Sequence, residues 1–303
     1  MGDDAGLAEA AIAIDYLQAM LGRAAETHAW ALRALELGLV AKRTREATQA
    51  AADLVWFAVA GPLPFGRFAE VASKLSGTDD NEIAAAAAGA LHAVAALARG
   101  EESSFREHEE RWREAIDRHG LSWLGATHQL AMGQVETSVG NPEQGEQRLR
   151  EARATLAGFG DIWWCETVDA ALCMAVAAQD RPREFLRLAD ALEQSVLVPD
   201  RQMVIRRNIV QARALMLRGS AADAEAAARR GLELAEQTDL VPDVAEALLT
   251  LAGTLETRGL PADGTLARSR AADLFRAKGN LPAAVNAERA RRPLHIAGTE
   301  RLR

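Results

Sequence analysis

Apolar residues recur along this chain with the three- and four-residue spacing of amphipathic helices, and short polar breaks interrupt the pattern at even intervals. Successive breaks are 39 or 40 residues apart, and a fixed period of that length indicates a repeat architecture. We predict that each unit is a helix, a tight turn, a second helix and a longer connection, with a left-handed residue at the turn. The turn residues are Gly22, Gly61, Gly100, Gly140, Asp180, Gly219 and Gly259.

Small residues occupy two fixed places in the unit, one seven residues before the turn and one twelve residues after it. Small side chains there allow the two helices of a unit to approach closely, and stacking of units then buries the apolar faces. Asp15 stands at the first place in the first unit and departs from the pattern. The small residues are Ala93, Gly133, Cys173, Ala212 and Ala252 before the turns, and Ala34, Ala152, Gly231 and Ala271 after them.

This arrangement resembles the tetratricopeptide repeat (TPR), in which a small residue, a glycine turn and a second small residue follow one another across two helices. The clearest stretch is 245–259 with Ala271, and residues 205–231 are similar. The usual period of the family is about 34 residues. The longer period is similar to that in the TPR regions of MalT-like, LuxR-type and AfsR-like bacterial regulators. The resemblance implies an all-α fold, an α-α superhelix of about seven helix pairs with a C-terminal capping helix.

The even register predicts one elongated TPR-like array over residues 1–303, without a central core that divides into halves. Residues 279–292 are expected to form the cap, because a solenoid needs a polar outer face at its end, and 293–303 a tail. The predicted repeats are 8–46, 47–85, 86–125, 126–165, 166–204, 205–244 and 245–278.

Composition agrees with a helical protein and excludes several classes. Alanine, the best helix former, accounts for 65 of the 303 residues, and arginine outnumbers lysine 32 to 3. The net charge of −8 argues against direct nucleic-acid binding, and two cysteines are too few for a disulfide scaffold. No apolar run is expected to reach the ~18 residues of a membrane span. We therefore expect a cytoplasmic protein without a membrane partner.

The chain carries no recognisable catalytic, metal or cofactor motif. No two of the six histidines have the i, i+4 spacing of a metal site on one helix, and no nucleophile elbow or dinucleotide fingerprint occurs. The segment 61–68 has the glycine spacing of a phosphate-binding loop but lacks its lysine and hydroxyl residues. We predict no enzyme activity, no metal and no cofactor.

The first helices of the units are expected to line the concave groove of the superhelix. Steps of three and four residues along three consecutive first helices place aromatic, methionine, arginine and polar residues on one face. Such a groove suits a peptide or a small ligand with an acidic group, because tryptophan and arginine are common binding hot spots and methionine is adaptable. The candidate binding residues are Trp123, Gln134, Thr137, Trp163, Met174, Arg206, Arg213 and Met216.

An alternative for Trp123 and Trp163 is that they only pack between neighbouring repeats. The other tryptophans, Trp30, Trp56, Trp112 and Trp164, are expected in the core.

The function predicted from these features is a non-enzymatic module that binds a peptide, a protein segment or a small effector in the concave groove. By resemblance, it is the sensor or interaction domain of a bacterial transcriptional or signalling regulator. The expected partners are a protein or peptide, or a small acidic effector, and a homodimer is a further expectation. The alternative is a structural TPR adaptor or dimerisation scaffold.

Overall fold

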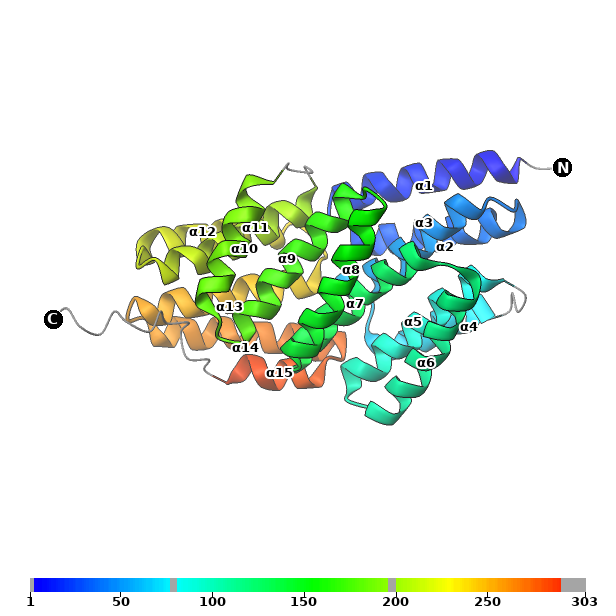
Figure 1. The fold of residues 1–303 in the computed structure, drawn as a ribbon. Helices are drawn as coiled ribbons and strands as arrows, with labels where there is room; N and C mark the ends of the chain where they lie inside the picture. Colours follow the sequence, from blue (N-terminus) through cyan, green and yellow to red (C-terminus); the bar gives the residue numbers. More distant parts are fainter. Residues whose placement is uncertain (1–2, 77–80, 196–199, 290–303) are drawn as a thin grey trace.

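The computed structural model describes residues 3–76, 81–195 and 200–289, and within these ranges its regular structure is entirely helical (Figure 1). The first seven helices are α1 (Asp4–Met20), α2 (Ala24–Val40), α3 (Thr44–Ala60), α4 (Phe68–Ser76), α5 (Glu82–Arg99), α6 (Glu102–His119) and α7 (Ser122–Val139). The next eight are α8 (Pro142–Gly158), α9 (Ile162–Ala178), α10 (Pro182–Gln194), α11 (Arg201–Leu217), α12 (Ala221–Ala235), α13 (Val241–Thr257), α14 (Pro261–Lys278) and α15 (Leu281–Glu288). A short 3-10 turn, η1 (Phe65–Arg67), precedes α4.

The helices pack on their neighbours in the sequence, and six of the seven expected pairs form, from α1 with α2 to α13 with α14, with α15 as a single last helix. The second pair is the exception, because α3 packs on α2 and α4 packs on α5 rather than on each other. This arrangement confirms the predicted all-α superhelix of helix pairs. The first helices begin a few residues earlier than the predicted repeats do, so the bounds 126 and 166 lie inside α7 and α9. Helix α15 lies within the predicted cap 279–292, of which residues 279–289 are described. The predicted tail 293–303 lies outside the described residues.

Six of the seven predicted turn residues have the left-handed backbone, including Asp180 with a φ of 54°. Gly61 is the exception, because its backbone is extended, with φ −91° and ψ −170°. A Cβ at Gly61 would lie 2.7 Å from the Phe57 carbonyl oxygen and 2.8 Å from Ala24 Cβ. Glycine is therefore needed at this turn for close packing rather than for a left-handed conformation.

Three of the six connections between pairs are as short as the turns within pairs, so the expected longer connection is wrong at these places, whereas the connections that lead into α5, α11 and α13 are longer. Only Gly120 and Leu121 separate α6 from α7, and Gly120 is left-handed. Three residues separate α8 from α9, with Gly160 left-handed in the same way. The repeat is therefore built from two nearly equal halves of about twenty residues each.

The small residues act as predicted at the helix crossings. All five small positions before the turns are buried, as are the four after them. The closest approach joins α7 to α8, where a Cβ at Gly145 would lie 2.7 Å from the Gly133 carbonyl oxygen. Here two helices meet backbone to backbone, which is the role that the sequence pattern assigned to these positions.

One described helix has the length and apolar character of a membrane span. Helix α5 has 18 residues with a mean hydropathy of 1.3, so the expectation that no apolar run reaches this length is wrong. Within the fold 72% of the helix is buried, as in a core helix.

The array closes on itself, a feature that the even register of the repeats does not predict. Helix α15 contacts α5 and α7, and α11 and α13 contact α1 and α3, respectively (Figure 1). At one contact the backbone amides of Ala24 and Ala25, which begin α2, donate to the carboxylate of Asp239 at 2.5 and 2.9 Å. At another, Lys278 reaches the end of α3. The last third of the chain therefore packs against the first third.

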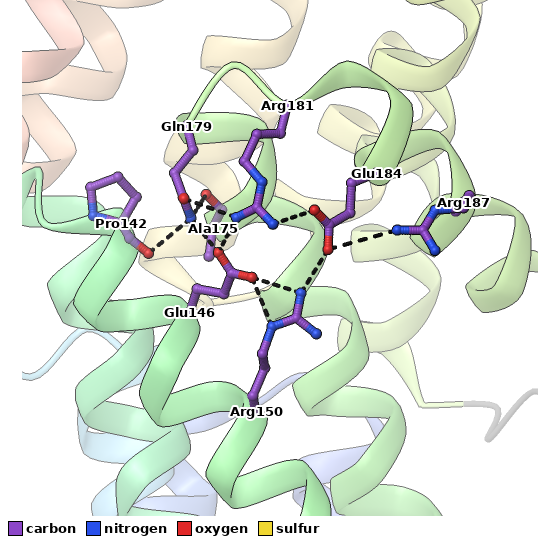
Figure 2. A network of polar contacts seen from close by, with 8 residues as sticks. All are labelled: Pro142, Glu146, Arg150, Ala175, Gln179, Arg181, Glu184 and Arg187. Atoms are coloured by element: carbon purple, nitrogen blue, oxygen red, sulfur yellow. Dashed lines mark hydrogen bonds and ion pairs between the residues drawn. The ribbon is translucent and has the colours of Figure 1, made fainter.

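Arginine side chains link consecutive units on the outer helices. Figure 2 shows Glu146 of α8 accepting from Gln179 at 2.7 Å and paired with Arg150 at 2.6 Å and with Arg181 at 2.5 Å. Arg150 extends the network to Glu184 of α10 at 2.8 Å. Guanidinium groups can bridge several carboxylates at once, which agrees with the excess of arginine over lysine.

Candidate functional site

Four of the eight predicted site residues line one cavity at the centre of the closed array. Gln134 and Thr137 come from α7, Met174 from α9 and Arg206 from α11. Residues of α3, α13 and α14 complete the wall, and the cavity volume is about 70 Å³. Because the array closes on itself, the cavity at the centre of the superhelix is small.

A second cavity of about 450 Å³ adjoins the central one, since Thr137 lines both. Arg213 and Met216 of α11 line it, together with Gly253 of α13 and residues near the turn ends of α7 and α9. We call these two cavities together the inner groove. Six of the eight predicted residues therefore lie along it, on three first helices as expected.

Four arginines line the inner groove, and the two that the sequence singled out, Arg206 and Arg213, are paired with carboxylates. The other two, Arg268 and Arg289, lie in the larger part of the groove. Arg206 is only 8% exposed, and its Nε donates to Asp243 Oδ1 at 2.7 Å while its Nη2 donates to Gln134 at 2.8 Å. Arg213 pairs with Glu246 at 2.8 Å and donates to Thr250 at 3.0 Å. An acidic ligand at Arg206 or Arg213 would have to displace these carboxylates, so these two residues do not offer a free positive charge to a small acidic effector.

Trp123 and Trp163 lie in a different cavity from the other six residues. Trp56 of α3 stands between the two regions: its ring packs edge-on against Trp164 at a centroid distance of 6.0 Å and lies 5.1 Å from the Arg206 guanidinium. Its indole N–H donates to Gln202 at 3.2 Å, and Gln202 donates to Asp243 at 2.8 Å. This buried network divides the face that helical stepping presented as continuous.

The cavity that contains Trp123 and Trp163 has a volume of about 960 Å³ and is larger than either part of the inner groove. It lies between α1, α3 and the beginnings of α7 and α9. We call it the aromatic–acidic cavity. Its aromatic lining residues are Tyr16, Trp123, Phe159, Trp163 and Trp164, and its charged lining residues are Glu9, Asp15, Arg45, Glu46, Asp53 and Asp161.

The aromatic rings are held by contacts with one another and with Asp161. Tyr16 and Trp163 pack edge to face at a centroid distance of 5.0 Å, and Trp123 packs edge-on against Trp164 at 6.4 Å. Asp161 caps α9 by accepting from the Trp164 amide at 3.1 Å, and it also accepts from the Trp123 indole at 2.9 Å. The two tryptophans thus pack between repeats and also line the cavity.

Asp15 and Asp53 form a carboxyl pair in the wall of this cavity. Burial raises the pKa of Asp15 to about 10, and repulsion by Asp53 and a hydrogen bond with it add to the shift. Burial also raises the pKa of Asp53 to about 6, although hydrogen bonds from Asp15 and from Gln49, at 2.8 Å, oppose the increase. The pair therefore shares a proton near neutral pH.

Sequence reasoning missed Asp15 and Asp53 as site residues. The available signal was the carboxylate at the buried position where five of the six later units have Ala, Gly or Cys, since Asp15 is only 1% exposed. Trp164 was expected only in the core, yet it lines the cavity, and Trp30 was expected in the core but is 37% exposed. Among the described residues, no group of three or more histidine, cysteine and acidic side chains is placed to hold a metal ion.

The consecutive helix pairs and their closure define the chain as a TPR-like helical-repeat solenoid. Among solved structures it is similar to the crystal structure of a Rap protein complexed with competence and sporulation factor, with a TM-score of 0.53. The alignment covers 90% of this chain and 77% of the Rap chain at 9% sequence identity, so the likeness concerns the fold alone. No protein-family model matches the chain, and no curated protein matches it.

Proposed function

We propose that the chain is a non-enzymatic binding module that takes a peptide or protein segment in the inner groove. The observation that carries the proposal is the placement of Thr137, Arg213 and Met216 around the part of the groove that has room for side chains. The fold similarity to a protein solved in complex with competence and sporulation factor adds support. The role would be that of a sensor or interaction domain in a bacterial regulator, as the TPR resemblance implies.

The chemistry of the groove favours a peptide over a small acidic effector. Met174 and Met216 provide adaptable apolar surface at either end of the groove. Arg206 and Arg213 are held by carboxylates, so neither offers a free positive charge to a single anionic group. An extended backbone with mixed side chains can satisfy both kinds of surface, whereas one anionic group cannot.

Filling the roomy part of the groove tests the proposal. A Cβ at Gly253 meets only the Met216 methyl, at an ordinary contact distance of 3.7 Å, so Gly253→Phe directs a ring into the cavity that Gly253 lines. Gly158→Phe is the matched control, because a Cβ there meets nothing within 4 Å on an exposed helix end. Peptides selected on the purified protein from a displayed random heptapeptide library should bind Gly253→Phe about tenfold more weakly, which corresponds to about 1.4 kcal/mol.

Gly158→Phe should retain the wild-type affinity for the selected peptides, and both variants should melt at or above the wild-type temperature. Selection of no peptide, or equal binding by Gly253→Phe, would overturn the groove assignment. A dimerisation scaffold is the second candidate, because Leu17 of helix α1 and Leu21 directly after it are exposed by half or more. Light scattering at increasing protein concentration distinguishes it, since a firm dimer without peptide binding favours the scaffold.

A further inference from the structure

We propose that the aromatic–acidic cavity is a second binding site, separate from the inner groove, and that it takes a protonated alkyl amine. The proposal goes beyond the proposed function, because it concerns different residues and a ligand of opposite charge to the acidic effector expected at first. Its basis is the combination of a roomy cavity, aromatic faces and a carboxyl pair in which Asp15 is buried and Asp53 partly buried.

Aromatic side chains are concentrated in this cavity. It is lined by the single tyrosine of the chain and by three of its six tryptophans, although aromatic residues make up only 5% of the sequence. The face of a tryptophan or tyrosine ring attracts an ammonium group, and the attraction grows as water is excluded. The edge-to-face pairs leave some ring faces free of stacking partners, as with Tyr16 against Trp163 at an interplanar angle of 65°.

The carboxyl pair supplies the charge that an ammonium group needs. Asp15 is 1% exposed, and its Oδ1 has no hydrogen-bond partner among the described residues. An unsatisfied buried oxygen is unfavourable, and two adjacent buried carboxylates can both ionise only beside a cation. A bound alkylammonium would donate hydrogen bonds to this pair and replace the proton that the two residues share.

The other charged groups around the cavity agree with a cationic ligand. Asp161 adds a carboxylate, whereas Glu9 and Glu46 are both paired with Arg43, which lies outside the lining. Arg45 is the one cation among the six charged lining residues. With one proton on the aspartate pair, the lining retains an excess of negative charge. The volume of about 960 Å³ is ample for a diamine.

Titration calorimetry with 1,4-diaminobutane on the full chain tests the proposal, with 1,4-butanediol as the uncharged probe of the same length. We expect saturable binding of the diamine, a change in tryptophan fluorescence and no binding of the diol. Titration in two buffers of different ionisation enthalpy should show proton release near neutral pH, because the amine replaces the shared proton. A short acetylated and amidated peptide with one lysine forms a parallel arm, which tells whether the amine can belong to a side chain.

Asp15→Asn keeps a hydrogen-bond donor toward Asp53 but cannot release a proton to become the second carboxylate beside the amine, and it should weaken diamine binding at least about tenfold. Asp117→Asn is the matched control on an exposed position of α6 and should bind as the wild type does. Trp163→Leu, with Trp30→Leu as its control, provides an independent variant if Asp15→Asn does not fold. Absence of diamine binding by the wild type, or unchanged binding by Asp15→Asn and Trp163→Leu, overturns the proposal. Gly253→Phe should bind the diamine normally, so failure of this site is distinguishable from failure of the groove.

Discussion

At the residue scale, a single unusual side chain distinguishes the first unit from the later ones. The place seven residues before the turn is occupied by Ala, Gly or Cys in five units, and these residues pack at helix crossings. Asp15 is buried at the same place and faces Asp53. Burying a carboxyl group beside a second one costs folding free energy. A residue that lowers stability in this way points to a role in binding, and the proposal of a second site therefore rests on Asp15 and Asp53.

The aspartate pair predicts how stability changes with pH. An acid with a pKa raised to about 10 in the folded state keeps its proton after the unfolded chain, with an ordinary value of 3.8, has lost it. The free energy of unfolding should therefore fall as the pH rises between those values. Asp15→Asn should remove much of that slope and raise the melting temperature at about pH 8 by about 2–4 °C, a gain on the order of 1 kcal/mol. Thermal melts at about pH 5 and about pH 8 measure both effects. A melting temperature that Asp15→Asn lowers at both pH values would contradict the shared proton.

At the element scale, the helix pairs could be predicted from the sequence because their causes are local. A turn residue with left-handed backbone and a small residue at a fixed distance belong to the same short segment, so the period reveals both. The Gly61 turn shows the limit of this reasoning. Its glycine is required by Ala24, a residue of the preceding unit, and the spacing of glycines does not distinguish that cause from a left-handed turn. The ion pairs that link different helices, such as Arg150 with Glu184, were not predicted either, because many charged residues share the same spacing.

The network around Glu146 carries the prediction at this scale. Burial by itself would raise the pKa of Glu146, but hydrogen bonds from Gln179, Arg150 and Arg181 outweigh burial and lower it. The contribution of the Glu146 carboxylate to the free energy of unfolding should be complete at pH values above its ordinary pKa of 4.5. It should be lost as the pH falls through the lowered pKa of the folded state. Near neutral pH, Glu146→Gln should cost about 1–2 kcal/mol, since the two arginines are half exposed to solvent.

Denaturant unfolding at neutral and acidic pH tests this prediction, with Glu143→Gln as the matched change on an exposed position of the same helix. The difference between Glu146→Gln and the wild type should shrink in acid, whereas Glu143→Gln should stay near the wild type throughout. Equal effects of the two variants would show that the network contributes little to linking α8 with α10.

At the scale of the whole molecule, the closure of the array is the feature that the repeat pattern does not predict. A repeat pattern specifies contacts between neighbouring units, and it contains no information about units more than 200 residues apart. Closure also explains why the predicted groove residues fall into two regions, since Trp56 of an early unit enters between Trp164 and Arg206 of later ones. Steps of three and four residues correctly placed the candidate residues on one face of each first helix. The residues that other helices bring to the same cavities could not be predicted in this way.

Two oppositely charged residues hold the closure at the ends of adjacent helices. Asp239 accepts from the first amides of α2, where the helix dipole favours negative charge. Lys278 is 2% exposed, and its Nζ donates at 2.6 Å to each of three carbonyl oxygens at the end of α3, those of Ala58, Gly61 and Leu63. The negative end of a helix dipole favours this cation, and the rings of Phe65 and Phe68 lie 5.0 and 5.5 Å from its Nζ.

Lys278→Met should therefore weaken closure more than it disturbs any helix pair. The methionine keeps an apolar stem in the site but leaves three backbone carbonyls without their donor, at a cost of about 2–3 kcal/mol. We expect a lower melting temperature together with a larger radius of gyration by small-angle X-ray scattering, while circular dichroism still reports full helix content. Lys74→Met, on an exposed position of α4, is the control and should change neither quantity.

Because the central cavity owes its small volume to the helices that Lys278 brings together, opening of the array should also make the lining residues Met174 and Gln134 more accessible to solvent. A variant that melts early yet stays as compact as the wild type would show that closure depends on the apolar contacts of α15 with α5 and α7 rather than on this lysine.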